Sequence, residues 1–493
     1  MDGFLAKVVE VEVAFIRALP SFSIVGIAGA SIQESKERVK SALSKVDFKF
    51  PPQKVTVNLS PSDLKKEGSH FDLPIALLIA LQNSEKNFND FFAFGELGLD
   101  GRLKDTNLIF PTILSLAKDK MIKKVIVPKD SVEKVIKIPG IEIFSAKTLK
   151  EAIDIFSTDI KPTLSSTKLE FDFIEYNKTK YYFQQEFKLD FLDIYGQEIA
   201  KRASLISAAG MHNILFVGSP GCGKSMCAKR IRYILPPMKL EEILESAKLD
   251  SLSAKEPSFR PIRAMRSPHH SASRASIFGG GSKNAQIGEV ALANNGVLFF
   301  DELPHFAKTV LESLREPLED NRLLISRVNT KIEYKTKFLF IAAMNPCPCG
   351  NLLSQKNECR CSDLEIQRYK NRLSSPLLDR IDIHVQMDEI RSDDKPTISS
   401  SDMFKKVCQA FKMQLQRGQK ELNGKMSDLE IDTHCKLDKQ NRTILNSAIQ
   451  RFNLSQRGIK KVLKVARTIA DLDQSCSIQK SHLLESLSYR MRD

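Results

Sequence analysis

The chain has 493 residues, and 74 Lys and Arg against 60 Asp and Glu give it a formal net charge of +14. A single hydrophobic core stops growing at about 250–300 residues, so this length predicts two or three domains. With 42% hydrophobic and 27% charged residues, the composition is that of a globular protein and excludes a disordered or fibrous one. No stretch reaches the roughly 18 uninterrupted apolar residues of a membrane helix, which excludes a membrane span.

The N-terminal residues and the cysteines indicate a compartment. The chain does not begin with the charged and then apolar pattern of a secretory leader, so we expect a cytoplasmic protein with no membrane partner. Its nine cysteines should stay reduced there, and closely spaced ones are interpreted as metal ligands or buried thiols. The positive charge favours a polyanionic partner such as nucleic acid.

Residues 1–160 mix short Val- and Ile-rich runs with amphipathic stretches. Alternation predicts strands at 8–14 and 54–59, and helical spacing predicts a helix over 31–45. We therefore expect an N-terminal domain of mixed strands and helices. The largely polar stretch 161–185 has no sustained period, and we interpret it as a linker.

Residues 186–392 alternate apolar runs with helical patterns, which predicts an α/β domain with a parallel sheet flanked by helices. Three runs, at 214–217, 297–300 and 338–343, are apolar at every position, as strands buried on both faces are. A charged stretch then leads into residues 393–493, whose periods are helical. We expect this last segment to form a helical C-terminal domain.

A glycine-rich loop follows the first of these buried strands and precedes a helix-forming segment. The loop consists of Gly218, Ser219, Pro220, Gly221, Cys222, Gly223, Lys224 and Ser225. Glycines let backbone N–H groups close on a phosphate, Lys224 reaches the β- and γ-phosphates, and Ser225 ligates Mg²⁺. The strand before and the helix after are the context this motif requires, so it predicts a site for ATP and Mg²⁺.

The second buried strand ends in two carboxylates, Asp301 and Glu302. Hydrolysis of a phosphoanhydride needs positioning and charge stabilisation more than covalent chemistry. We therefore assign Asp301 to the Mg²⁺ shell and Glu302 to polarising the attacking water. The third strand runs into Asn345, whose neutral amide can orient that water; alone, this residue would be an ordinary strand-end cap.

Arg380 follows in the segment 375–382. A guanidinium is the group that best stabilises charge on a transferring phosphoryl group, and a neighbouring molecule often supplies it. The alternative is a salt bridge between Arg380 and Asp379 or Asp382.

Two cysteine pairs come soon after Asn345, namely Cys347 with Cys349 and Cys359 with Cys361. Four thiolates in two close pairs can complete a tetrahedral Zn²⁺ site. Their C-x-C spacing is tighter than the usual spacing of zinc ligands, so reduced structural thiols remain the alternative.

The motif set resembles that of AAA+ ATPases, in the phosphate loop, the Asp301-Glu302 strand, Asn345 and the segment 377–380. More narrowly, several stretches resemble the magnesium-chelatase-like ComM/YifB family over essentially the whole chain. These stretches are residues 267–273, 279–281, 295–303, 314–319 and 343–350.

This resemblance implies an AAA+ core with an α-helical C-terminal lid, assembled as a hexameric ring with ATP between subunits. It implies that Arg380 is a finger acting on the neighbouring subunit's nucleotide and that Arg457 is the second sensor arginine. The implied activity is ATP-driven branch migration and unwinding of DNA during natural transformation.

Residues 65–74 and 94–103 resemble the proteolytic domain of Lon-type proteases, which implies a Lon-like α+β fold for residues 1–160. Such an enzyme needs a serine activated by a nearby lysine. The nucleophile position falls on His70, Phe110 stands where the lysine is expected, and Ser69 is one residue out of register. We therefore expect a scaffold or DNA-contacting domain without peptidase activity, in which Ser69, His70 and Asp72 are capping and turn residues.

Basic residues gather in two insertions and on one helical face near the C-terminus, where they suit phosphate contacts or, equally, a solvated surface. They are Arg263, Arg266, Lys283, Arg327, Lys331, Lys460, Lys464 and Arg467. The leading hypothesis is a ring ATPase that moves branched DNA. The alternatives are an ATP-driven motor that remodels a protein, of magnesium-chelatase or chaperone type, and an ATP-dependent protease, which His70 disfavours.

Overall fold

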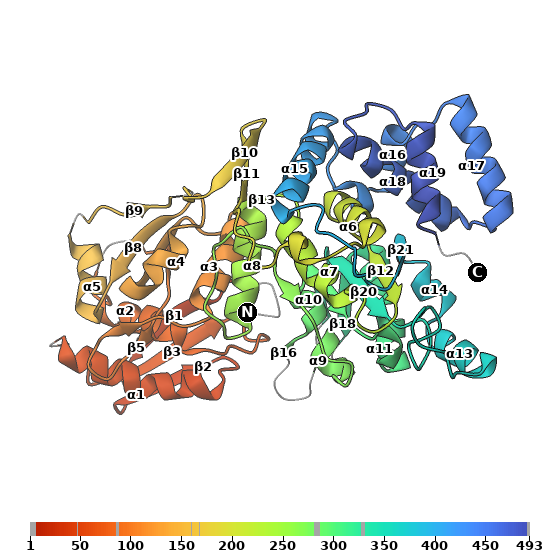
Figure 1. The fold of residues 1–493 in the computed structure, drawn as a ribbon. Helices are drawn as coiled ribbons and strands as arrows, with labels where there is room; N and C mark the ends of the chain where they lie inside the picture. Colours follow the sequence, from red (N-terminus) through yellow and green to blue (C-terminus); the bar gives the residue numbers. More distant parts are fainter. Residues whose placement is uncertain are drawn as a thin grey trace. The chain divides into compact units, whose positions relative to one another are not determined.

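Figure 1 shows the fold, a computed structural model that describes residues 6–46, 48–84, 88–158, 160–166, 168–280, 286–326 and 331–490. The chain forms two compact units. The first comprises Met1–Glu170 and Ala247–Phe259, and the second comprises Phe171–Ser246 and Arg260–Asp493. In the described ranges, no helix combines the length and the apolar character needed to cross a bilayer.

The first unit contains two main sheets and the helices that cover them. The sheet β1-β3-β2 joins β1 (Glu10–Ile16), antiparallel to β3 (Lys54–Ser60), with β2 (Ser21–Val25), parallel to β3. The sheet β4-β7-β8-β9 joins β4 (Phe91–Ala93), β7 (Lys124–Pro128), β8 (Glu142–Ala146) and β9 (Thr163–Leu164). A short pair joins β5 (Glu96–Leu97) and β6 (Leu103–Lys104). The helices are α1 (Ala30–Lys45), η1 (Ser69–Phe71), α2 (Asp72–Ala80), α3 (Ile109–Lys118), η2 (Lys129–Ser131), α4 (Val132–Val135) and α5 (Leu149–Ser157).

The apolar residues that alternate in β3 and recur at helical spacing in α1 form part of the core of this unit. Strand β3 buries every second side chain, including Val55 and Val57, and α1 buries Ile32 and Val39 at helical spacing. These residues pack in one core with the apolar helix α2. The two strands and the helix predicted here are confirmed, with ends shifted by one or two residues.

A segment from the middle of the chain completes the first unit. Residues 247–259 belong to this unit, and the ring of Phe259 packs edge-on against Phe110, with ring centroids 5.2 Å apart. The ammonium of Lys134 lies 3.0 Å from both Glu256 and Asp105. The sequence predicts residues 247–259 within the ATPase domain, and the structure differs because a contact between residues about 150 positions apart leaves no periodic signal.

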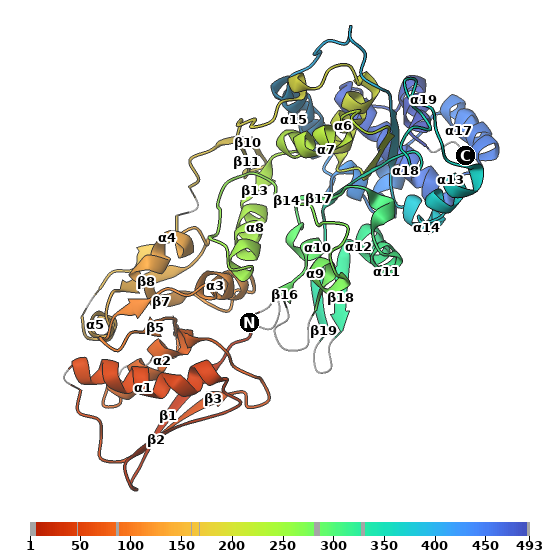
Figure 2. The same ribbon diagram turned by 60° about the horizontal axis from the view of Figure 1, so that its bottom comes forward.

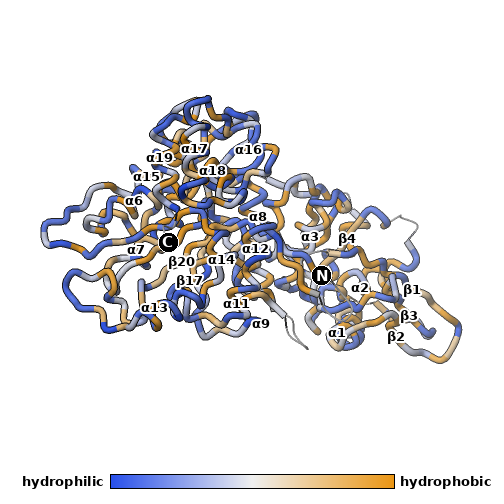
Figure 3. Tube along the Cα trace, turned by 90° about the vertical axis from the view of Figure 1, so that its right-hand side faces the viewer, coloured by the Kyte–Doolittle hydropathy of each residue, from blue (hydrophilic) through white to orange (hydrophobic). Residues whose placement is uncertain are grey.

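A five-stranded parallel sheet forms the centre of the second unit. Its order is β14-β17-β20-β12-β21, with β14 (Met265–Arg266), β17 (Val297–Phe300), β20 (Leu339–Met344), β12 (Ile214–Gly218) and β21 (Ile383–Met387). All side chains of β17 and β20 are buried, and Figure 3 shows hydrophobic residues concentrated in these strands. The three buried strands predicted from apolar runs are confirmed, with β20 shifted by one residue. The α/β class and the parallel sheet are also confirmed.

Helices and short hairpins surround this sheet (Figures 1 and 2). The helices before residue 300 are η3 (Phe191–Asp193), α6 (Glu198–Gly210), α7 (Lys224–Ile231), η4 (Arg232–Ile234), α9 (Arg274–Phe278) and α10 (Glu289–Leu292). Helix α8 (Leu240–Leu252) starts in this unit, and its residues from 247 onward belong to the first unit. Those that follow are η5 (Leu303–His305), α11 (Lys308–Ser313), α12 (Arg315–Asp320), α13 (Asp363–Lys370) and α14 (Ser375–Leu378). The hairpins pair β15 (Gly279–Gly280) with β16 (Gln286–Ile287), and β18 (Arg322–Ser326) with β19 (Lys331–Lys335). Figure 2 shows the pair β18–β19 extending away from the parallel sheet.

The C-terminal region is helical, as predicted. It consists of α15 (Ser400–Gln416), η6 (Asn423–Lys425), α16 (Asp428–His434), α17 (Lys439–Phe452), α18 (Gln456–Leu472) and α19 (Lys480–Ser488). Helix α18 has two apolar sides: Val465 and Ile469 join the core of the parallel sheet, while Val462 and Ala466 join a smaller core among the C-terminal helices. The helical region is therefore part of the same compact unit as the sheet.

The predicted linker contains a β-hairpin. Strands β10 (Asp172–Tyr176) and β11 (Thr179–Phe183) pair with each other, and β11 also pairs with β13 (Met238–Lys239). The ring of Tyr181 packs edge-on against Phe411 of α15. This aromatic residue of the polar stretch thus packs within the second unit, against a partner about 230 positions away that a local pattern cannot reveal.

Candidate nucleotide-binding site

The phosphate loop joins β12 to α7 at the carboxyl edge of the parallel sheet, and its glycines have different roles. Gly221 and Gly223 have positive φ values of 81° and 96°, which favour glycine. A Cβ at Gly218 would lie 2.8 Å from the carbonyl oxygen of Met387 on β21, so this glycine permits a close backbone approach. A Cβ added to Gly221 would meet no heavy atom within 4 Å, so there is room for a ligand against this part of the loop.

Lys224 is the first residue of α7, and its ammonium turns back over the loop. It donates to the carbonyl oxygens of Gly218 (2.6 Å) and Ser219 (2.8 Å) and to the side-chain oxygen of Asn345 (3.1 Å). Burial lowers the pKa of Lys224, and the nearby Asp301 opposes this shift. The predicted pair Lys224 and Asn345 is therefore brought together.

The side chains predicted to hold Mg²⁺ also meet. Strand β20 lies between β12 and β17, and the register places Met344 opposite Val217 and Ala342 opposite Phe300. Ser225 then donates a hydrogen bond of 2.7 Å to Asp301. A hydroxyl and a carboxylate oxygen are ligands that Mg²⁺ prefers, so these residues fit the ion.

Glu302 stands beside this pair in a left-handed conformation, with φ at 52° and a side chain 55% exposed. Its backbone N–H donates to the carboxylate of Asp301, while its own carboxylate lies 3.7 Å from Nδ1 of His270. The strained turn directs this carboxylate to solvent at the edge of the site. The sequence gives no sign that His270 lies beside Glu302, because the two residues are 32 positions apart and in different loops.

Arg380 and Arg457 share one partner, Glu319 at the end of α12. The guanidinium of Arg380 is 9% exposed and also donates to the carbonyl oxygens of Arg315 and Pro376, whereas Arg457 is 58% exposed. Among the described residues, the hydrogen bonds of Arg380 go to these groups and none goes to the phosphate loop.

The proposed salt bridge of Arg380 with Asp379 or Asp382 is not formed. Asp379 lies 3.7 Å from Arg490, and Asp382 lies 3.1 Å from Lys461 and accepts from the backbone of Asn213. Burial alone would raise the pKa of Asp382, but Lys461 and His212 hold it well below the ordinary range. Arg380 does form a salt bridge, as the alternative interpretation expected, but its partner is Glu319 and neither Asp379 nor Asp382.

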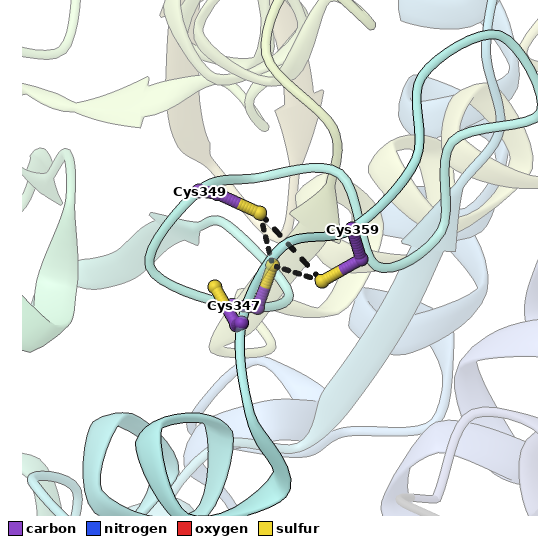
Figure 4. Close-up of side chains that lie close together, drawn as sticks. Cys347, Cys349 and Cys359 are labelled. Carbon is purple, nitrogen blue, oxygen red and sulfur yellow. Dashed lines mark hydrogen bonds between the residues drawn. The ribbon is translucent and has the colours of Figure 1, made fainter.

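Cys347, Cys349, Cys359 and Cys361 form a group that we call the cysteine cluster. Their four Sγ atoms all lie within 4.8 Å of one another. Figure 4 shows Cys347, Cys349 and Cys359 pointing toward one another, with Sγ–Sγ distances of 3.4, 3.6 and 3.7 Å. The two predicted pairs thus come together.

Most basic residues proposed for DNA contact have partners in the protein. Arg263 is buried and bonds to Glu242 and to backbone carbonyls, and Arg266 pairs with Glu289 through two hydrogen bonds. The prediction that Arg467 belongs to an exposed basic face of α18 is wrong, because Arg467 is buried beside Asp471. Two further basic residues, Lys283 and Arg327, and the side chain of Lys331 lie outside the described part of the chain.

Two more basic residues of α18 have different surroundings. Lys460 pairs with Asp428 at 2.7 Å on the surface, and Lys464 donates to the carbonyl oxygen of Gly424. Burial lowers the pKa of Lys464. Of the helical face predicted from spacing, only Lys460 is a surface cation.

The sequence around His70 forms part of the first unit's core. His70 is 6% exposed and its ring packs at a tilt against Phe71, while Ser69 donates to Glu96. Asp72 is fully buried and accepts hydrogen bonds from Ser35, from Arg38 (2.6 Å) and from the backbone of Leu97. Asp72 is thus a buried ion-pair partner of Arg38, so the prediction that Asp72 is a capping or turn residue is wrong. The local sequence could not show this pair, because Arg38 is on α1 and Asp72 is on α2.

Comparison with known proteins agrees with this arrangement. The model of magnesium chelatase, subunit ChlI, matches residues 190–395; that of subunit ChlI of Mg-chelatase matches 9–131; and that of its C-terminal region matches 397–490. Competence protein ComM of Haemophilus influenzae is 37% identical over 99% of this chain and 95% of its own length. The chain belongs to the ComM/YifB family of magnesium-chelatase-like proteins. The uncharacterized protein YifB of Escherichia coli, from the same family, is 38% identical over 100% of the chain and 96% of its own length.

Family membership agrees with the AAA+ core and the parallel sheet of the second unit. The family suggests ATPase activity with nucleotide and Mg²⁺, and its AAA+ type suggests an oligomer. The matched regions follow the order N-terminal region, ATPase sheet and helical C-terminus.

Proposed function

We propose that this protein is an ATP-hydrolysing ring motor that acts on DNA and moves branch points in recombination intermediates during natural transformation. The observation that carries the ATPase part is the convergence of Lys224, Asn345, Ser225 and Asp301 at one edge of the parallel sheet. The relative named for competence and the net charge of +14 support the DNA part.

Each residue of the site has a task in hydrolysis. Lys224 and the backbone of the phosphate loop bind the β- and γ-phosphates, and Ser225 and Asp301 would hold Mg²⁺. When bound, Mg²⁺ neutralises charge that develops on the phosphate oxygens. Glu302 accepts a hydrogen bond from the attacking water, and Asn345 orients this water beside the γ-phosphate.

Arg380 would act on a nucleotide held by a neighbouring subunit, and Arg457 would contact nucleotide as the second sensor arginine. Both arginines bond to Glu319, so one carboxylate holds the nearly buried guanidinium of Arg380 close to the exposed guanidinium of Arg457. A guanidinium supplied across an interface stabilises charge on the transferring phosphoryl group and makes hydrolysis depend on assembly. We infer a homo-oligomeric, hexameric ring from this arrangement and the family.

We also propose that the first unit is a Lon-like scaffold or DNA-contacting domain without peptidase activity. A peptidase of that type needs an activated serine. The hydroxyl of Ser69 donates to Glu96, and Phe110 occupies the position expected for the lysine.

The test is a fluorescent four-way junction incubated with ATP and with wild-type protein or Glu302→Gln. We expect wild type to convert the junction to its branch-migrated products. Glu302→Gln should bind ATP and assemble but leave the junction intact, because water activation is lost while the phosphate contacts remain. Equal conversion by both proteins would overturn the role of Glu302. No conversion by an active wild-type ATPase would direct the search to a protein substrate.

A further inference from the structure

The cysteine cluster has the dimensions of a single metal site. Zn²⁺ binds thiolate sulfur at about 2.3 Å in tetrahedral geometry, which separates the sulfur atoms by about 3.8 Å. The Sγ–Sγ distances of 3.4, 3.6 and 3.7 Å in the cysteine cluster are close to this edge length. A disulfide would need a distance of about 2.05 Å, and all four cysteines are free thiols.

Other uses of four cysteines fit less well. Thiolates that hold an iron–sulfur cluster bind different iron atoms and therefore stand farther apart than thiolates on one ion. Thiols that only fill a hydrophobic core are buried, but Cys349 is exposed, and Cys359 and Cys361 are half-buried. Partly exposed sulfur atoms gathered this closely indicate a shared ligand.

We propose that the cysteine cluster binds one structural Zn²⁺, and that this ion holds the segment between β20 and α13 against the phosphate loop.

The segment between β20 and α13 needs such a cross-link. From Asn345 to Ser362 the chain forms no helix or strand. Loops of this length without regular structure are uncommon in compact domains and are usually functional. Its first pair of cysteines lies just after β20 and its second just before Ser362, which caps α13. One ion would therefore tie both ends of the segment together.

The segment also touches the nucleotide site at two places. Gly350 has φ at +81°, and a Cβ there would lie 2.6 Å from Cδ of Pro220 in the phosphate loop. Tyr369 of α13 lies beside the backbone of Asn345, and burial raises the pKa of this tyrosine to about 12. Loss of the ion would release Gly350 and Asn345 from these contacts. This second half of the proposal rests on the proposed nucleotide site, whereas the first half does not.

Binding is balanced in protons and charge. Four neutral thiols give up four protons when their sulfur atoms bind one Zn²⁺, which leaves a site of net charge −2. The exposed cations Lys356 and Arg360 belong to the same segment and reduce this charge, although the exposed Glu358 between them offsets one of the two positive charges. Metal binding should therefore release protons and weaken as the pH falls.

The first experiment measures metal in protein purified without chelators, by inductively coupled plasma mass spectrometry. We expect about one zinc per chain in wild type and in Cys476→Ser, whose exposed cysteine is outside the cluster. The double variant Cys349→Ser/Cys361→Ser should lose the zinc. Equal zinc in the double variant, or iron in place of zinc in wild type, would overturn the proposal.

A second measurement does not depend on the folding of a variant. Metal-free wild type is titrated with Co²⁺, and a tetrahedral thiolate site produces intense sulfur-to-cobalt charge-transfer bands and visible d–d bands. We expect saturation near one Co²⁺ per chain and displacement of the bands by Zn²⁺. Absence of these bands would contradict the site even if purified protein contained zinc.

The link to the phosphate loop is tested with Gly350→Ala. We expect this variant to keep its zinc and to bind a fluorescent ATP analogue more weakly, because the added methyl group displaces Pro220. Unchanged nucleotide affinity in both Gly350→Ala and the zinc-free double variant would overturn the link. If wild type bound no nucleotide, the proposed function would fail, but the zinc and Co²⁺ results would still decide the metal site.

Discussion

Lys224 is held at the phosphate loop by acceptors of its own chain. The carbonyl oxygens of Gly218 and Ser219 and the amide oxygen of Asn345 fix its ammonium where the phosphates of a nucleotide would be bound. A bound phosphate would replace these weak acceptors with a charged one. The lowered pKa of Lys224 reflects burial, and a phosphate dianion would reverse this effect.

Lys224→Ala tests this role at the scale of one residue. A hydrogen bond to a charged group contributes about 1.5–3 kcal/mol, so we expect ATP to bind about 10- to 100-fold more weakly. The measurement is a titration with a fluorescent ATP analogue. Lys229→Ala is the matched control, because Lys229 is exposed on the same helix. An unchanged dissociation constant for Lys224→Ala would remove this residue from the site.

Helix α2 and the turn η1 before it show how a short element can carry a pH dependence. His70 in η1 is buried against Phe71 and Phe94, and its Nδ1 has no hydrogen-bond partner among the described residues. Burial lowers the pKa of His70 from 6.5 to about 4. The unfolded chain therefore binds this proton between pH 6.5 and 4 while the folded chain does not, so stability falls as the pH is lowered.

We expect the first unit to lose about 3 kcal/mol of stability from His70 between pH 7 and pH 4. His70→Phe keeps an aromatic ring and removes this titration, so the same unit should show a flatter pH profile. His70 is the one histidine in the sequence of this unit, which makes the assignment direct. The measurement is pulse proteolysis in urea, with fragments of the first unit followed by mass spectrometry. If the stability of the first unit falls with pH equally in wild type and in His70→Phe, the inference that His70 is buried in its neutral form would be contradicted.

At the scale of the whole molecule, local patterns predicted the sheet and its site but not the contacts across the sequence. Strands such as Val297–Phe300 are apolar throughout, and parallel strands bring their carboxyl ends to one edge, so the meeting of Asp301 with Ser225 follows. The pairing of Arg380 with Glu319 and the packing of Phe259 on Phe110 join residues about 60 and 150 positions apart. No period or motif specifies such partners.

The proposed ring is tested by mixing two variants that we expect to be inactive on their own. Arg380→Ala lacks the finger and Glu302→Gln lacks the water-activating carboxylate. A random 1:1 mixture has about a quarter of its interfaces with Glu302 on one side and Arg380 on the other. We expect partial recovery of ATP hydrolysis that is greatest near equal amounts. Absence of recovery at every ratio would indicate that Arg380 acts within its own subunit through Glu319.

The steady-state rate of ATP hydrolysis with and without DNA tests the central claim most directly. Wild type and Glu302→Gln are compared with no DNA, with single strands and with a four-way junction, at two salt concentrations. We predict that DNA stimulates wild type, that the stimulation weakens at the higher salt because phosphate contacts are screened, and that Glu302→Gln is inactive throughout. Hydrolysis by wild type that is the same with every DNA would contradict a motor acting on DNA.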